Sequence, residues 1–87
     1  MEPEEITGSL RAYIVEHYAI PTGDADFSDD VHLFDYGYID SFGAVDLVSF
    51  VQKAFGITVS QSDIIAYPMN TINEIAAFTA LRQKGEL

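Results

Sequence analysis

Cysteine is absent from the 87-residue sequence, and basic residues are scarce. Without cysteine there is no disulfide pattern to interpret, and any thiol chemistry has to come from a cofactor. Four Lys and Arg residues stand against 14 Asp and Glu residues, which gives a formal net charge of -10. A surface this acidic repels phosphate backbones, so the composition disfavours nucleic acid as a partner and favours basic protein surfaces.

Long apolar runs are also missing. The sequence contains no stretch able to span a bilayer, no signal peptide and no lipidation motif. We therefore expect no membrane span and a cytoplasmic location. The length leaves room for one domain, residues 1–87, with a modest core and no separate substrate domain.

Helical periodicity dominates what is present. Apolar residues recur at helical spacing in residues 3–20, 41–56 and 71–84, and a shorter pattern covers 62–66. Ser62 and Asp63 offer a cap for the short helix, and Gly56 ends the one before it. Thr71 and Glu74 form a capping box for the last helix. These features predict an all-α fold, a small four-helix bundle with a long first loop and a short third helix.

The first loop, residues 21–40, is acidic and aperiodic. From Asp24, its carboxylates and Ser28 partly follow the spacing of a calcium loop, but Asp29 stands where that loop needs glycine, and Asp35 replaces the final glutamate. We expect a solvated acidic loop without a metal site, anchored by Val31, Leu33, Phe34 and Ile39. An acidic, cation-dependent protein-binding module without a covalent cofactor is the alternative function.

Ser41 lies just before the second helical pattern, and two interpretations of it are open. Its hydroxyl could cap the helix, as serine often does. It could instead be displayed for modification, because the free amides and dipole of a helix N-terminus favour an added phosphate. The neighbours Asp40 and Phe42 make the second interpretation worth testing.

Rotation of the second pattern by about 100° per residue separates two faces. The stripe expected to be buried consists of Ala44, Leu47, Val48, Val51, Ala54 and Phe55. The opposite face holds Phe42, Asp46, Ser49 and Lys53, with Val45 and Phe50 on its flanks. A small apolar patch with a charged rim, built from Phe42, Val45 and Asp46, is typical of a transient docking surface.

A hydrolase with Ser41 as nucleophile is a further alternative. His17 or His32 could supply the base, with an aspartate to orient it, but such roles depend on geometry. The Gly-x-Ser-x-Gly motif of a nucleophile elbow is absent around Ser41. We therefore expect no catalytic residues and a protein that is not an enzyme.

The segment 33–47, with Asp40-Ser41-Phe42 at its centre, resembles the phosphopantetheine attachment region of acyl carrier proteins, and the similarity extends over nearly the whole chain. The resemblance implies a four-helix bundle whose serine, Ser41, receives a 4'-phosphopantetheine arm through a phosphodiester. The thiol at the end of that arm would carry an acyl group as a thioester. Asp40 would be the neighbouring acid of the motif, and Phe42, Val45 and Asp46 would meet partner enzymes.

The resemblance also implies the kinds of partner. They are a phosphopantetheinyl transferase, an acyl-activating ligase or synthetase, and acyltransferase or synthase enzymes of fatty acid, polyketide or nonribosomal peptide biosynthesis, acting on a monomeric carrier. Two departures matter: Phe42 replaces the usual leucine or methionine, and the second helix has few acids. Segments 33–37 and 55–59 are also similar to D-alanyl and other aminoacyl carriers, so the cargo is either an acyl chain or an amino acid.

Overall fold

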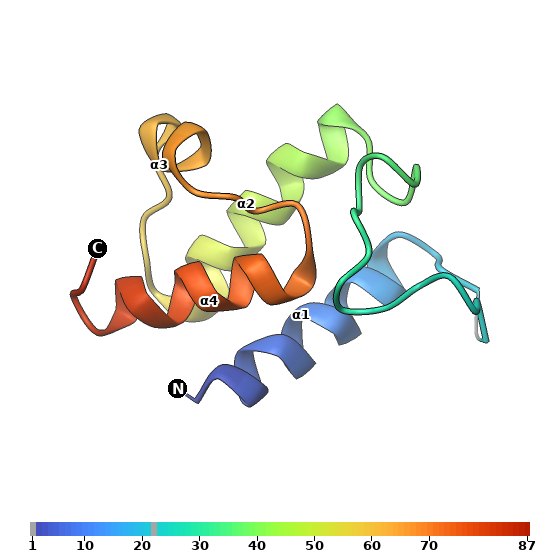
Figure 1. Cartoon of the computed structure of the whole chain (residues 1–87), viewed down its shortest axis with the longest axis horizontal. Helices are drawn as coiled ribbons and strands as arrows, with labels where there is room; N and C mark the ends of the chain where they lie inside the picture. Colours follow the sequence, from blue (N-terminus) through green and yellow to red (C-terminus); the bar gives the residue numbers. More distant parts are fainter. Residues whose placement is uncertain (1, 22) are drawn as a thin grey trace.

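The computed structural model describes residues 2–21 and 23–87, and within these ranges all regular structure is helical. The described residues form four helices, α1 (Pro3–His17), α2 (Ser41–Phe55), α3 (Gln61–Ala66) and α4 (Ile72–Gln83). This arrangement confirms the predicted all-α fold with a long first loop and a short third helix. In Figure 1, α1 lies below α4, α2 crosses behind α4, and α3 stands apart above α4. In the described part of the chain, no helix has the length and apolar content needed to cross a membrane.

The helix ends follow local capping chemistry. Thr71 and Glu74 form the predicted capping box of α4, and Gly56 ends α2 in the left-handed conformation with φ 66°. The predicted cap of α3 at Ser62 was wrong. The N-cap is Ser60, two residues earlier, and it makes a capping box with Asp63, the other residue expected to cap this helix.

The core is built mainly between α1 and α4, which pack along one another. Its buried apolar members from these two helices are Ile6, Leu10, Ile14, Ile72, Ile75, Ala76 and Ala80. From α2, Leu47, Val51 and Phe55 join them, as the periodicity predicted. The prediction was wrong for Ala54, which is exposed because α2 approaches α4 along a narrower stripe than an ideal amphipathic pattern assumes.

The first loop is part of this core. Val31, Leu33 and Ile39 are buried in it, which confirms three of the four expected anchors, while Phe34 is half-buried at its edge. The Leu33 amide donates a hydrogen bond of 2.9 Å to the Asn70 carbonyl oxygen, and the Leu33 carbonyl oxygen accepts one of 3.1 Å from the Ile39 amide. The loop is therefore held between the start of α2 and the segment before α4.

Truncation of Leu33 tests this role of the loop. Leu33 is fully buried, so we expect Leu33→Ala to lower the free energy of unfolding by about 2–5 kcal/mol, as for other buried leucines. Urea unfolding followed by circular dichroism measures the change. Phe42→Ala, at a side chain that is 87% exposed, is the control and should stay within about 0.5 kcal/mol of wild type. Equal effects of the two substitutions would contradict the loop's place in the core.

Candidate functional site

Asp40, not Ser41, caps α2. The Oδ1 atom of Asp40 accepts a hydrogen bond of 2.8 Å from the Gly43 amide, and Asp40 has the extended backbone typical of an N-cap. The interpretation of Ser41 as the capping residue was therefore wrong. Ser41 is instead the first residue of the helix and is exposed. Because a neighbour does the capping, the Ser41 hydroxyl is left available at the positive end of the helix dipole.

The two large side chains predicted to be exposed after Ser41 are exposed. Phe42 keeps 87% and Val45 73% of its surface in contact with solvent. They stand one turn apart on α2, so they form an apolar patch beside the serine. Asp40, the N-cap residue beside Ser41, is exposed at this end of the helix, so the patch has an acidic rim there.

Asp46 is engaged with α1. Its Oδ2 atom accepts hydrogen bonds from the Tyr13 hydroxyl at 2.6 Å and the Tyr18 hydroxyl at 2.9 Å, and the His17 Nε2 atom lies 3.1 Å away. Tyr13 also stacks on Phe50 of α2, with ring centroids 3.8 Å apart. Asp46 therefore lies half-exposed at the α1–α2 seam and has a structural role that its periodicity did not indicate.

These contacts shift three pKa values. The hydrogen bonds from Tyr13 and then Tyr18 hold the pKa of the Asp46 carboxyl below its ordinary value. Burial, together with the hydrogen bond to Asp46, raises the pKa of Tyr13 from 10.0 to about 12 and raises that of Tyr18 as well. The ionised carboxylate and the protonated phenols thus stabilise one another.

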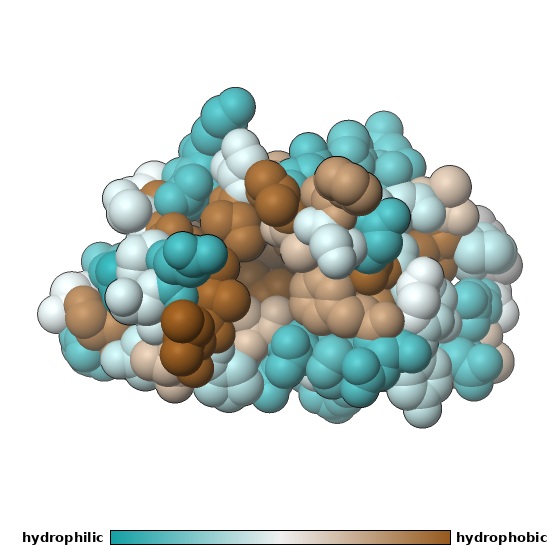
Figure 2. Space-filling view, turned by 90° about the horizontal axis from the view of Figure 1, so that it is seen from above, coloured by the Kyte–Doolittle hydropathy of each residue, from teal (hydrophilic) through white to brown (hydrophobic). Residues whose placement is uncertain are grey.

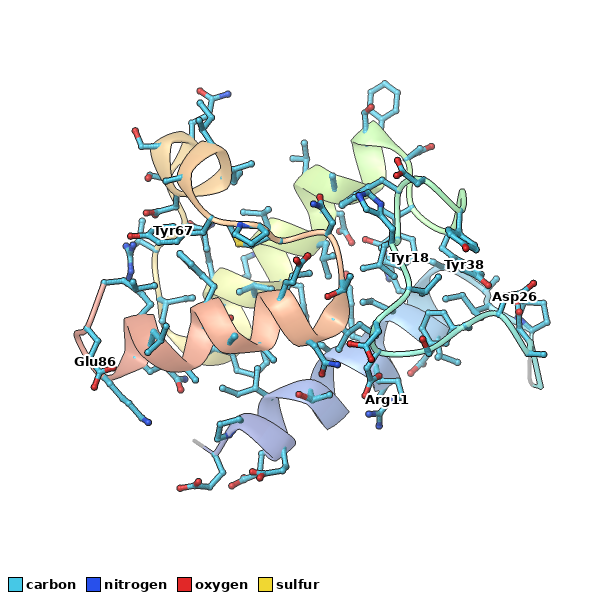
Figure 3. All side chains as sticks on the ribbon, in the orientation of Figure 1. Arg11, Tyr18, Asp26, Tyr38, Tyr67 and Glu86 are labelled. Atoms are coloured by element: carbon cyan, nitrogen blue, oxygen red, sulfur yellow. The ribbon has the colours of Figure 1, made fainter. Side chains whose placement is uncertain are left out.

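The close packing of α1 and the first loop on α2 leaves no space for a side chain at Gly43. A Cβ atom added there would lie 2.7 Å from Cγ2 of Ile39 and 3.1 Å from Cε1 of Tyr18. The Tyr18 hydroxyl also lies 2.8 Å from the Gly43 carbonyl oxygen. Tyr18 is thus packed directly on the first turn of α2, the turn that presents Ser41 (Figure 3).

Three carboxylates of the acidic loop accept hydrogen bonds within the protein. Asp29 pairs with Arg11 through both carboxylate oxygens, Asp30 accepts a hydrogen bond of 2.6 Å from Asn73, and Asp24 accepts one of 3.1 Å from Tyr38. Within residues 2–21 and 23–87, no group of three or more acidic or histidine side chains is placed to hold a metal ion. The loop is tied to α1 and α4 by these bonds.

The histidines considered for a hydrolase are engaged away from Ser41. His17 lies beside Asp46 and stacks on Tyr13 with ring centroids 4.8 Å apart. The Nδ1 atom of His32 accepts a hydrogen bond of 3.0 Å from the Asp35 amide. Among the described residues, neither histidine forms a hydrogen bond with Ser41, so the structure assembles no nucleophile and base pair there.

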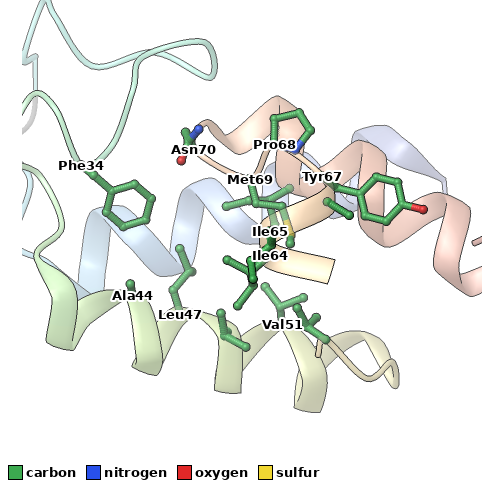
Figure 4. Close-up of a pocket in the computed structure, with 14 residues that line it drawn as sticks. Phe34, Ala44, Leu47, Val51, Ile64, Ile65, Tyr67, Pro68, Met69 and Asn70 are labelled. Atoms are coloured by element: carbon green, nitrogen blue, oxygen red, sulfur yellow. The ribbon is translucent and has the colours of Figure 1, made fainter. Parts of the chain in front are cut away.

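A pocket that the residue pattern did not predict lies between α2 and α3. The pocket has a volume of about 430 Å³ and a mainly apolar lining, to which Tyr67 and Asn70 add polar groups. Figure 2 shows the corresponding recess, bordered by hydrophobic side chains, and Figure 4 shows its walls. Ala44, Leu47, Val48 and Val51 of α2 form one wall, which explains why Ala44 and Val48, expected in the core, are only half-buried. The pocket begins at Ala44, about one helical turn from Ser41.

The comparison with protein families identifies the class. The family described as phosphopantetheine attachment site matches residues 9–79, so the chain belongs to this family of carrier proteins. The similar proteins include the D-alanyl carrier protein of Bacillus velezensis, which is 39% identical over 46 residues. That match covers 53% of this chain and 59% of the relative's length, so less than two thirds of the relative is aligned.

The cofactor of the family is 4'-phosphopantetheine, and the first turn of α2 fits its phosphate. Ser41 is exposed, and the opening amides of a helix suit a phosphodiester. When bound, the arm supplies the thiol that the chain itself lacks. Carrier proteins of this family act with a phosphopantetheinyl transferase and with biosynthetic enzymes.

The tyrosine contacts at the α1–α2 seam predict a loss of stability at high pH. Because the pKa of Tyr13 rises from 10.0 to about 12 on folding, its contribution is fully present below pH 10.0 and is lost as the pH rises through about 12. We expect the urea midpoint to fall across this interval and the double variant Tyr13→Phe, Tyr18→Phe to flatten that fall. Tyr36→Phe, at an exposed tyrosine, is the control and should keep the wild-type profile. A double variant with an undiminished alkaline fall would be evidence against these contacts.

Proposed function

We propose that this chain is an acyl carrier protein in which Ser41 bears the phosphopantetheine arm. The observation that carries the proposal is the division of roles at the start of α2, where Asp40 caps the helix and leaves the adjacent serine hydroxyl exposed. The family match over residues 9–79, which include this turn, supports the assignment. The proposal takes residues 1–87 as one carrier domain.

Attachment is a phosphoryl transfer to Ser41. The serine oxygen forms the new bond to the phosphorus that bears the pantetheine in coenzyme A. The pyrophosphate bond of coenzyme A breaks, adenosine 3',5'-bisphosphate leaves, and the serine proton passes to a base on the transferase. In this step the chain contributes the exposed hydroxyl and the amides of the first helical turn, which favour the resulting phosphodiester.

The apolar patch of Phe42 and Val45, with its acidic rim, is the proposed docking surface for the enzymes that load and unload the arm. Its exposure and its position beside Ser41 support this role. A partner with basic groups around an apolar depression complements it. Asp46 supports this surface indirectly, because its hydrogen bonds to α1 fix the orientation of α2, the helix that carries the patch.

Intact mass tests the attachment site. After incubation with coenzyme A and a permissive phosphopantetheinyl transferase, we expect the mass of the wild-type chain to increase by one phosphopantetheine and that of Ser41→Ala to stay unchanged. Since Asp40 provides the cap, Ser41→Ala should cost less than the roughly 1 kcal/mol typical of a lost cap. Ser49→Ala, at another serine of α2, is the matched control and should be modified normally. Modification of Ser41→Ala would refute the site.

The pocket between α2 and α3 supports an uncharged acyl chain as cargo. Its volume of about 430 Å³ lies within the range of about 300–1,000 Å³ typical of ligand sites. Its lining of aliphatic and aromatic side chains favours burial of methylene groups, each worth about 0.8 kcal/mol. Ala44, one of its lining residues, lies within one helical turn of the serine.

An aminoacyl cargo is the second candidate, and the similarity to a D-alanyl carrier protein favours it. The thioester of an amino acid would bring an ammonium group, and desolvation of a charge in an apolar pocket is costly without a partner. Such a cargo would therefore remain in solvent beside α2, and the pocket would contribute nothing to holding it.

Thermal unfolding of loaded chains separates the two cargoes. We expect an octanoyl group on the arm to raise Tm relative to the unacylated arm by about 4 °C or more, because each kcal/mol gained moves Tm of a domain this small by about 4–8 °C. D-Alanyl loading should leave Tm unchanged. If the octanoyl form unfolds at the same temperature as the unacylated form, the acyl pocket is refuted and the aminoacyl candidate is favoured.

A further inference from the structure

α3 contributes almost nothing to the hydrophobic core. Its one buried residue among the six is Asp63, while Ile64 and Ile65 are 48% and 84% exposed. The segments on either side are anchored, because Val59 and Met69 pack against the core. α3 is thus a short helix between two anchored segments, and its apolar side chains lie outside the core.

The pocket explains where those side chains lie. α3 forms the wall opposite α2, and Ile64, Ile65 and Ala66 line the cavity from that side. Figure 4 shows Ile64 and Ile65 facing the helix that carries Leu47 and Val51. The position of α3 therefore sets the width of the pocket.

Hydrogen bonds and an ion pair with Arg82 of α4 hold α3 in position. The Arg82 Nη2 atom donates a hydrogen bond of 2.7 Å to Oδ1 of Asp63, and the other carboxylate oxygen accepts one of 2.9 Å from the Ser60 amide. A longer contact of 3.4 Å joins Arg82 Nη1 to the Thr58 carbonyl oxygen, in the segment leading to α3. Arg82 also lies over the Phe78 ring, with Cζ 5.1 Å from the centroid.

Arg82 does not use all of its hydrogen-bond donors in these contacts. The Nε atom of Arg82 is buried and has no hydrogen-bond partner among the described residues. An unpartnered buried donor carries a free-energy cost, which reduces the net gain from the other contacts of Arg82. A small displacement of α3 thus gives up one charge-assisted bond and little apolar contact.

We propose that the Asp63–Arg82 ion pair holds α3 as the adjustable wall of the α2–α3 pocket and is thereby a determinant of which acyl chains the carrier shields. The inference rests on the proposed acyl carrier function for its cargo. Its mechanical part, that Arg82 restrains α3, concerns the unloaded chain alone. Both residues act by positioning, since neither lines the pocket.

Hydrogen exchange of the unloaded chain tests the mechanical part. The Ile64 and Tyr67 amides donate bonds to the Ser60 and Asp63 carbonyl oxygens and report on α3. In Arg82→Met we expect these amides to exchange about tenfold faster, as local opening becomes easier, while those of α2 keep wild-type rates. Asp63→Asn, which retains an oxygen for the Ser60 amide, should show the same pattern.

Arg11→Met is the matched control. Arg11 also pairs with an aspartate, Asp29, but in the first loop and away from the pocket, so its loss changes the net charge equally. We expect wild-type exchange of α3 in this variant. If neither Arg82→Met nor Asp63→Asn accelerates α3 exchange in a folded chain, or if Arg11→Met does so equally, the proposal is overturned.

Cleavage of the thioester by hydroxylamine tests the effect on cargo. In the wild type we expect the octanoyl thioester to be cleaved about tenfold more slowly than the acetyl thioester, because a shielded state dominates. Arg82→Met should lose most of this difference, and Arg11→Met should keep it. Equal cleavage of both thioesters in the wild type would refute the acyl pocket of the proposed function. A shielded wild type with an equally shielded Arg82→Met would refute the role of the ion pair alone.

Discussion

The packing of α1 along α4 is the constraint on which the rest of the structure depends. It uses up the apolar faces of both helices, with Ile6, Leu10 and Ile14 buried on one side and Ile72 and Ile75 on the other. α2 then reaches this core through a narrow stripe and is held at its flank by large side chains of α1. One side of α2 therefore packs against α1. Another side faces α3 and lines the pocket between the two helices.

Asp40 and Asp46, the aspartates on either side of Ser41 in the sequence, have different roles. Asp40 binds the amide of Gly43 and frees the serine, while Asp46 accepts the phenolic hydrogen bonds that hold α2 to α1. The acids of the first loop are bonded largely to partners within the protein, including Arg11. A net charge of -10 thus does not imply a uniform acidic docking surface. Beside the apolar patch, Asp40 supplies an exposed carboxylate.

Much of the fold follows from the sequence, because periodicity and caps act locally. The capping box at Thr71 and the stop at Gly56 could be predicted from neighbouring residues alone. The end of α1 could not, since Ala19 adopts the left-handed conformation, with φ 53°, that usually indicates glycine. At the site, the position and exposure of Ser41 were accessible from local pattern. The bonds of Asp46 and the Asp63–Arg82 pair were not, because they join residues separated by 19 positions or more along the chain.

The proposed acyl cargo would place two opposed requirements on the chain. It must be stable without the cargo, which demands a complete core, and it must offer apolar space near the attachment point, which a complete core would close. Here α1, α4 and the first loop supply the stability, with Leu33 and Thr79 fully buried. α3 stays outside that core and is held by polar bonds that are directional and few. Displacement of such a wall costs less than opening packed aliphatic side chains. A buried ion pair contributes little net free energy over a well-packed apolar pair. The main role of Asp63 is therefore to fix the position of α3, and its contribution to stability is secondary.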